Sequence, residues 1–218
     1  MDQPPHNDYL RRLQTDLEDL EDRAQMRRLE TVAGVNFCSN DYLGLSTAPR
    51  LRAALTAVLA AGSPVSSTGS RLLSGHARVW DELENELAAL AGAEAALYFN
   101  SGYAANTGLF SCIPKPDDLV FSDSANHASI IDGIRLSGAR KVIFPHLDLN
   151  FLEDELRRTA SGREQKFIAV ESVFSMDGDR APLSALLELA ERHGAELIVD
   201  EAHATGVMGP QGRGLIAE

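Results

Sequence analysis

Cysteine is scarce in this sequence, and long apolar runs are missing. Cys38 and Cys112 lie far apart and match no metal-ligand spacing, so we expect two reduced thiols rather than a disulfide framework or a zinc site. No run approaches the roughly 20 apolar residues of a membrane span, and residues 1–23 are too polar and acidic for a signal peptide. The sequence therefore predicts a cytoplasmic protein with no membrane partner.

Basic residues are also few, with 20 Lys and Arg against 32 Asp and Glu and a net charge of −12. Because phosphate backbones require a basic surface, we expect no nucleic-acid partner. Several catalytic motifs are absent as well: G-x-x-x-x-G-K-[ST], G-x-G-x-x-G after a strand, H-E-x-x-H and G-x-S-x-G. These absences argue against a P-loop enzyme, a dinucleotide-binding enzyme, a zinc protease and a serine hydrolase.

The N-terminal region has the pattern of an amphipathic helix. Leu10, Leu13, Leu17 and Leu20 recur at spacings of three and four residues, with charged residues between them. We predict that residues 1–45 form a helical arm and linker, and that the arm packs on another surface such as a second subunit. Residues 46–218 are predicted to form the main domain.

Apolar segments alternate with helical patterns through the main domain. Pro49 and Gly62 bracket a predicted helix, as proline at a helix start and glycine past its end often do, and a second helix carries Val79 to Leu90. Short apolar strands alternating with helices indicate an α/β fold with a mostly parallel sheet covered on both faces. Strands are predicted over 95–99, 119–121, 141–144, 167–170 and 196–199, and further helices over 128–136, 149–158 and 182–193 and from Gly102.

Polar segments follow these strands, and ligands bind near the carboxyl ends of parallel strands. Residues 100–106 place Gly102 in a small turn before a helix, which could bind an anion or be a plain turn. Residues 122–129 contain His127, which could stack on a planar ligand, move a proton or simply cap a helix. Residues 171–179 crowd acidic and hydroxyl groups that could serve a site or only form a turn.

The last polar segment, residues 199–206, delivers Asp200 to the end of an apolar strand, with His203 three residues later. Asp200 could bind magnesium beside a nucleotide, as in the DEAH-box helicases, or pair with a protonated ring nitrogen of a cofactor. The helicase interpretation requires an upstream phosphate loop, which is absent. We interpret Glu171 and Asp177 as mainly structural.

Taken together, these segments resemble the α-oxoamine synthases, a family of fold-type-I enzymes that use pyridoxal 5'-phosphate (PLP). The resemblance covers about residues 36–216. It implies a three-layer large domain preceded by an N-terminal helical arm. The matching segments occur in the family order: Ser39-Asn40-Asp41-Tyr42-Leu43-Gly44-Leu45, Gly69-Ser70-Arg71-Leu72-Leu73-Ser74-Gly75, Asn100-Ser101-Gly102-Tyr103-Ala104-Ala105-Asn106, Asn126-His127-Ala128-Ser129, Val173-Phe174-Ser175-Met176-Asp177-Gly178-Asp179, Val199-Asp200-Glu201-Ala202-His203-Ala204-Thr205-Gly206 and the G-P-Q-G-R-G run of residues 209–214.

The resemblance also implies roles for individual residues. Gly102 and Tyr103 would bind the PLP phosphate, in keeping with a helix N-terminus. His127 would stack over the ring and help to place the substrate. Asp200 would keep the ring nitrogen protonated, because each charge stabilises the other, and that protonated ring is the electron sink. His203 would hydrogen-bond the phenolic oxygen and its surroundings, and it completes the catalytic set with His127 and Asp200.

The remaining implied roles concern the cofactor's surroundings and the substrate. Ser175, like His203, would hydrogen-bond the phenolic oxygen of the cofactor and its surroundings. No metal ion is expected. Asn40 would approach the substrate, and Arg27 or Arg28 would meet an acyl-chain carboxylate.

Residues 70–75 and 174–179 are most similar to the members of this family that serve biotin synthesis. The implied reaction is the decarboxylative condensation of L-alanine with a pimeloyl thioester, carried by coenzyme A or by a carrier protein, to give 8-amino-7-oxononanoate. A homodimer is expected. The alternatives are a relative of the glycine C-acetyltransferase or 5-aminolevulinate synthase type, or a non-catalytic chain that pairs with a full-length paralogue.

The family holds PLP covalently on a lysine in a later strand-end motif. The three lysines here are poorly placed for that role: Lys115 lies between prolines, and Lys141 and Lys166 begin predicted strands. We therefore expect these 218 residues to lack the covalent lysine and the small C-terminal domain, and to be inactive alone. Three explanations stay open: a partial sequence, a split enzyme completed by a second chain, or a decayed copy.

Overall fold

The computed structural model describes residues 6–31, 33–159 and 164–218. The chain divides into two compact units, Met1–Ser39 and Asn40–Glu218. In the first unit, the predicted N-terminal helix is confirmed as α1 (His6–Asp22), and its four stripe leucines are all exposed within that unit. The proposed boundary at residues 45/46 stays a prediction.

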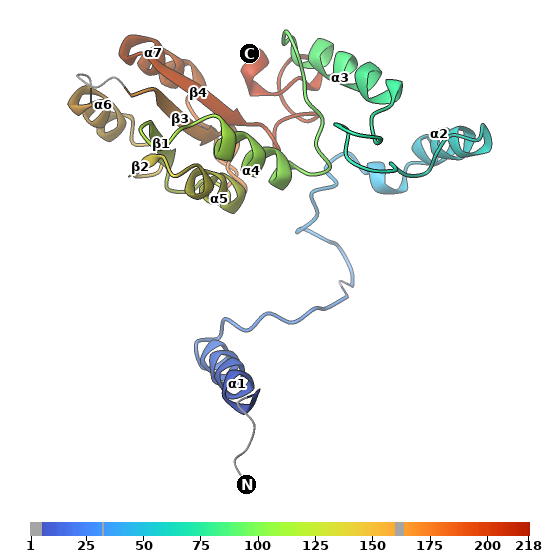
Figure 1. Cartoon of the computed structure of the whole chain (residues 1–218), viewed down its shortest axis with the longest axis horizontal. Helices are drawn as coiled ribbons and strands as arrows, with labels where there is room; N and C mark the ends of the chain where they lie inside the picture. Colours follow the sequence, from blue (N-terminus) through green and yellow to red (C-terminus); the bar gives the residue numbers. More distant parts are fainter. Residues whose placement is uncertain (1–5, 32, 160–163) are drawn as a thin grey trace. The chain divides into compact units, whose positions relative to one another are not determined.

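The centre of the second unit is a four-stranded parallel sheet (Figure 1). Its strand order is β2-β1-β3-β4, so β1 and β3 lie in the middle and β4 lies at one edge. Every residue of the two interior strands is buried, as expected when both faces of a sheet are covered. The strands are β1 (Leu119–Asp123), β2 (Arg140–Phe144), β3 (Lys166–Glu171) and β4 (Ala195–Asp200), each at its predicted place.

Helices cover both faces of the sheet, which confirms the three-layer prediction. Alternate side chains of a strand point to opposite faces: Val120 packs in a core with Phe110 and Ile130, whereas Phe121 packs in a core with Leu152 and Leu186. The first core lies under α4 (Gly102–Cys112) and α5 (Ala128–Ser137), and the second lies under α6 (Leu149–Arg158) and α7 (Leu183–His193).

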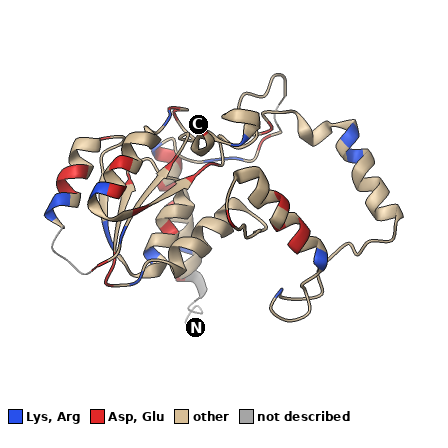
Figure 2. Ribbon diagram, turned by 90° about the horizontal axis from the view of Figure 1, so that it is seen from above, with Lys and Arg blue, Asp and Glu red and all other residues tan. Residues whose placement is uncertain are grey.

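Further helices and turns come before and after the sheet in the chain. The two predicted helices are confirmed as α2 (Pro49–Ala60) and α3 (Arg78–Ala91), and Gly92 ends α3 in the left-handed conformation that glycine adopts readily. The 3₁₀ turns are η1 (Leu45–Thr47), η2 (Pro210–Gly212) and η3 (Leu215–Ala217). Several helices carry both basic and acidic residues, such as α3 and α6, whereas α2 carries only basic ones (Figure 2). Within the described residues, no helix is both long and apolar enough to cross a membrane.

The prediction of a strand over 95–99 is wrong. These residues have no regular secondary structure and pair with none of the described strands. The backbone N–H of Tyr98 instead donates to the Glu84 carboxylate at 2.8 Å, so a side chain takes the place of a neighbouring strand. Leu97 and Tyr98 remain exposed. Apolar composition alone therefore misled the prediction, because a strand also requires a partner.

Gly133 allows α4 and α5 to pack closely. A Cβ atom at this position would lie 2.7 Å from Phe110 Cβ and 2.9 Å from the carbonyl oxygen of Asn106. Because the second contact is with backbone, a side-chain rotation cannot relieve it. We expect Gly133→Val to lower the free energy of unfolding by about 1–3 kcal/mol through overpacking, measured by urea denaturation.

The matched control is Ala128→Val, which adds the same kind of side chain at an exposed position of α5. Equal unfolding midpoints for the two variants would contradict close packing at Gly133.

Candidate active site

Three of the strands end in a carboxylate residue, so these residues lie at the carboxyl-terminal end of the sheet. Asp123 is the last residue of β1, Glu171 of β3 and Asp200 of β4, and Glu171 pairs in register with Asp200. Because the strands are parallel, these ends gather at the edge where α/β folds bind ligands. Asp123 and Glu171 are buried, whereas Asp200 is only partly covered.

The N-terminus of α4 is exposed at this edge. Ser101 caps the helix by accepting a hydrogen bond from the backbone N–H of Ala104 at 3.1 Å. The first N–H groups of a helix have no intrahelical partners, and the helix dipole makes this end attractive to anions. A Cβ at Gly102 would meet nothing within 4 Å, so the space beside the helix end is open. This turn can therefore accept a phosphate group.

Tyr103 lies beside His127, with their ring centroids 6.2 Å apart and the rings nearly perpendicular. Its hydroxyl donates to the Asp132 carboxylate of α5, and this hydrogen bond raises the pKa of Tyr103. The phenol therefore stays neutral near neutral pH and joins the start of α4 to α5.

His127 caps α5 through its ring. Ser129 N–H donates to His127 Nδ1 at 3.2 Å, and the Ser129 hydroxyl lies 2.7 Å from the same nitrogen. An Nδ1 that accepts a hydrogen bond leaves the proton of a neutral imidazole on Nε2. The residue itself is exposed, so its ring is available to a ligand while one edge is held by the helix. The capping role and the site role, treated as alternatives above, are compatible.

Asn106 connects the histidine segment to Asp200. Its Nδ2 donates to Asp200 Oδ2 at 2.7 Å and to Ser129 Oγ at 2.9 Å. Asp200 Oδ1 accepts from the backbone N–H of Ala202 at 2.8 Å. Both oxygens of Asp200 are thus oriented, and each keeps a further lone pair for a ligand. Sequence reasoning gave Asn106 no role, although it closes the motif that begins at Asn100.

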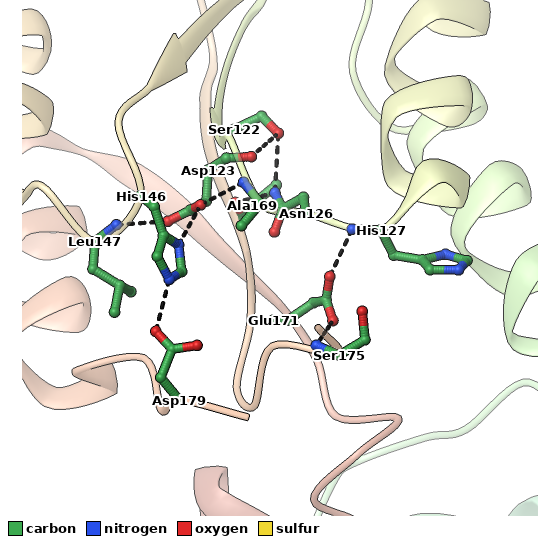
Figure 3. A network of polar contacts seen from close by, with 11 residues as sticks. Ser122, Asp123, Asn126, His127, His146, Leu147, Ala169, Glu171, Ser175 and Asp179 are labelled. Atoms are coloured by element: carbon green, nitrogen blue, oxygen red, sulfur yellow. Dashed lines mark hydrogen bonds and ion pairs between the residues drawn. The ribbon is translucent and has the colours of Figure 1, made fainter. Parts of the chain in front are cut away.

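Glu171 connects two of the predicted site segments, residues 122–129 and 171–179, through hydrogen bonds. Its Oε1 accepts from the backbone N–H of His127 at 2.6 Å, and its Oε2 accepts from that of Ser175 at 3.2 Å (Figure 3). Burial raises the pKa of Glu171, the nearby Asp200 adds to this, and the two backbone hydrogen bonds oppose it. The geometry agrees with the structural role expected for Glu171, and it shows that this role serves the site.

His203 and Asn40 line one pocket. The pocket has a volume of about 240 Å³ and is bounded by the turn after β4 and by residues 40–45. The Tyr42 hydroxyl lies 2.6 Å from His203 Nδ1, which ties the two segments together. The 40–45 segment is itself shaped by Asp41, whose carboxylate accepts from the backbone N–H groups of Leu45 and Ser46. Tyr42 carried no predicted role.

Arg71, in the Gly69–Gly75 motif, binds the Glu84 carboxylate of α3 through both terminal nitrogens, at 2.6 and 2.9 Å. The hydrogen bond from Arg71 holds the pKa of Glu84 at about 2. Arg71 thereby fixes this motif to α3.

The remaining predicted residues are less constrained. Ser175 is exposed, and its contact in Figure 3 uses the backbone rather than the hydroxyl. Arg27 belongs to the first unit and is not placed relative to the strand ends. Within the described ranges, no group of three or more His, Cys, Asp and Glu side chains is arranged to hold a metal ion.

The three lysines are poorly placed for covalent binding at this edge. Lys115 Nζ donates to the carbonyl of Cys112, and Lys166 Nζ lies 3.4 Å from the carbonyl of His193, which ends α7. Lys141 is the second residue of β2 and is exposed. Lys141 and Lys166 therefore occupy the amino ends of their strands, opposite Asp200.

Residues 32–218 match the family model described as aminotransferase class I and II. An 8-amino-7-oxononanoate synthase from Azoarcus sp. (strain BH72) is 52% identical over 182 residues, which are 84% of this chain and 46% of that protein. The enzyme of the same name from Herminiimonas arsenicoxydans is 48% identical over 205 residues, which are 89% of this chain and 52% of that protein. The chain thus spans about half the length of the curated relatives it matches.

Solved structures show the same relationship. A serine palmitoyltransferase from S. paucimobilis with bound PLP–myriocin aligns with a TM-score of 0.80 and 32% identity, over 94% of this chain and 56% of that one. An 8-amino-7-oxononanoate synthase from Francisella tularensis aligns with a TM-score of 0.67 and 34% identity, over 83% of this chain and 49% of that one. The chain therefore belongs to the aminotransferase class I and II family, in its α-oxoamine synthase group.

Proposed function

We propose that this chain supplies the PLP-binding face of an acyltransferase that condenses L-alanine with a pimeloyl thioester to give 8-amino-7-oxononanoate. The observation that carries the proposal is the orientation of Asp200, whose two oxygens are held by Asn106 and by the backbone N–H of Ala202. The relatives of that name, about 50% identical, support the substrate pair.

The described residues fit the phosphate and the ring of PLP. The exposed N-terminus of α4, at Gly102 and Tyr103, suits a phosphate dianion. The oriented carboxylate of Asp200 suits a protonated ring nitrogen, because opposite charges at close range stabilise each other. When bound, PLP supplies an electron sink for a carbanion formed next to the amino group.

The other site residues are proposed to position the cofactor and the substrate. His127 presents a ring whose one edge is held by Ser129, which suits stacking on a planar group. His203 and Ser175 are proposed to contact the polar rim of the cofactor, with His203 oriented by Tyr42. Asn40 lines the same pocket as His203 and is proposed to approach the substrate. Arg27 is proposed to meet the distal carboxylate of the acyl chain.

Covalent attachment of PLP needs a lysine, and Lys115, Lys141 and Lys166 all lie away from Asp200. We infer that this lysine comes from outside the 218 residues, as the partial coverage of the relatives also suggests. The chain alone is then expected to be inactive, and the assembled enzyme is expected to be a cytoplasmic homodimer.

The proposal can be tested with a completed chain, in which residues 1–218 are joined to the part of the Azoarcus synthase that follows its matched region. We expect this completed chain to convert L-alanine and pimeloyl-CoA into 8-amino-7-oxononanoate, detected by mass spectrometry. The 218 residues alone should give no product. A pimeloyl carrier protein as donor, glycine with acetyl-CoA, and glycine with succinyl-CoA are assayed in parallel, and turnover only with glycine would contradict the proposed substrate pair.

A non-catalytic role as the partner of a full-length paralogue makes a different prediction. The tagged 218-residue chain would then co-purify with a complete synthase from its native cells. A completed chain with turnover and a 218-residue chain without a partner would exclude that alternative.

A further inference from the structure

His146 lies between two carboxylates on the side of the site away from Asp200. Its Nδ1 is 2.9 Å from Asp123 Oδ1, and its Nε2 is 2.7 Å from Asp179 Oδ2 (Figure 3). Its ring also meets Phe174 at nearly a right angle, with centroids 4.4 Å apart. Asp123 is the last residue of β1, whereas His146 and Asp179 lie in the loops after β2 and β3.

The geometry indicates the protonation state of the ring. Carboxylate oxygens accept hydrogen bonds, so each ring nitrogen needs a hydrogen to make its contact, and only an imidazolium carries both. Burial by itself would lower the pKa of His146. The hydrogen bonds and charges of Asp123 and Asp179 outweigh burial, so the pKa of His146 is raised above its ordinary value.

Asp123 and Asp179 each organise a loop that carries a site residue, Asp123 through its carboxylate and Asp179 through its backbone carbonyl. Asp123 also accepts from the backbone N–H groups of Ala125 and Leu147, at 2.8 and 2.9 Å, so it shapes the turn that leads to His127. Asp179 closes the loop that contains Ser175, because the backbone N–H of Phe174 donates to its carbonyl oxygen at 3.0 Å.

His146 is a strong constraint on the second loop. Asp179 Oδ1 is buried and has no hydrogen-bond partner among the described residues, so the contact of Oδ2 with His146 is the side-chain interaction that compensates this carboxylate. The Asp179 side chain is 37% exposed, so only its buried Oδ1 carries the cost of burying charge without a partner. Loss of the imidazolium would therefore favour a displacement of the loop that carries Ser175.

We propose that His146 is a pH-sensitive positioning residue, which as an imidazolium fastens the turn that carries His127 to the loop that carries Ser175. Glu171 joins the same two segments through their backbone N–H groups, so the two connections together set the spacing of His127 and Ser175. The relevance of that spacing to PLP rests on the proposed function, whereas the connection itself does not.

The sign of the pH dependence follows from the raised pKa. Asp123 from β1 and Asp179 from the loop after β3 are the charged groups that face the ring, and Asp148 at the start of α6 is engaged instead with the backbone of Phe151. The stabilisation is fully present below the unfolded-state pKa of about 6.5. It is lost as the pH rises through the folded-state pKa.

An NMR titration of the labelled protein tests the proposal without any assay of activity. We expect the ring signals of His146 to titrate with a midpoint above about 6.5. The ring signals of His127 and the amide signal of Ser175 should shift with that same midpoint. A midpoint for His146 at or below about 6.5 would overturn the proposal. Signals of His127 and Ser175 that do not shift with the midpoint of His146 would overturn it as well.

Two variants and one control sharpen the experiment. His146→Gln should remove the shared midpoint from His127 and Ser175, whereas the control His193→Gln, at the end of α7, should leave it in place. Asp179→Asn keeps an acceptor but removes one charge, so all three signals should move together to a lower midpoint, and separate midpoints would contradict the coupling. If the coupling is present but the completed chain lacks turnover, the proposed function fails and the inference about His146 stands.

Discussion

Replacement of Asp200 by Asn is expected to reduce turnover of the completed chain by about 10²- to 10³-fold, the usual cost of removing one oriented electrostatic group from an active site. Asn retains the shape, but its single side-chain oxygen can accept from only one of the two donors, Asn106 Nδ2 and the backbone N–H of Ala202. It has no charge with which to hold a ring nitrogen protonated. The loss should therefore fall on kcat rather than on the fold, and it is measured by steady-state kinetics with L-alanine and pimeloyl-CoA.

Glu196→Gln provides a matched control for this experiment. Glu196 lies on the same strand, near its amino end, and is exposed. The same neutralisation of charge there should leave turnover unchanged. If Asp200→Asn kept full turnover, the role of Asp200 would be wrong. If both variants lost turnover equally, the effect would be one of net charge or of folding.

The fold could be predicted closely because its main signals are local. A short apolar run that alternates with helical patterns along the chain, such as Phe167–Val170, is typical of a strand buried on both faces. The amphipathic stripe of α6 shows a period of 3.6 residues in the sequence itself. The strand predicted over 95–99 failed because pairing depends on a neighbouring strand, and no local pattern shows that the Glu84 side chain takes the backbone N–H of Tyr98 instead.

The positions of the candidate site residues in the fold could be predicted in part for the same reason, whereas their roles stay predictions. His127 and Asp200 follow strands, and the ends of parallel strands must meet at one edge of the sheet. Asn106 and Asp200 are 94 positions apart in the chain, and only the fold brings them within hydrogen-bonding distance. His146 follows β2 without any motif around it, so its place between Asp123 and Asp179 had no signal in the sequence.

Asp123 depends on both kinds of information, the local pattern and the long-range contacts. It follows an apolar segment that was predicted as a strand, and its side chain binds residues that only the fold brings near it. Its carboxylate is buried and accepts from His146 and from two backbone N–H groups. Asp123→Ala would leave the imidazolium without one of its two partners and both N–H groups without theirs. We expect it to lower the free energy of unfolding by about 3 kcal/mol or more at pH 6, as for other broken buried pairs.

Urea denaturation at several pH values measures this effect, with Asp154→Ala as the control. Asp154 is an exposed carboxylate of α6 that pairs with Arg157 at 3.2 Å, so its loss should cost less than about 1 kcal/mol. The difference between wild type and Asp123→Ala should shrink as the pH rises through the raised pKa of His146, because a neutral ring no longer needs two carboxylates. It should not vanish, since the N–H groups of Ala125 and Leu147 lose their acceptor at every pH. A pH-independent difference would assign the whole effect to those backbone hydrogen bonds and would remove His146 from the network.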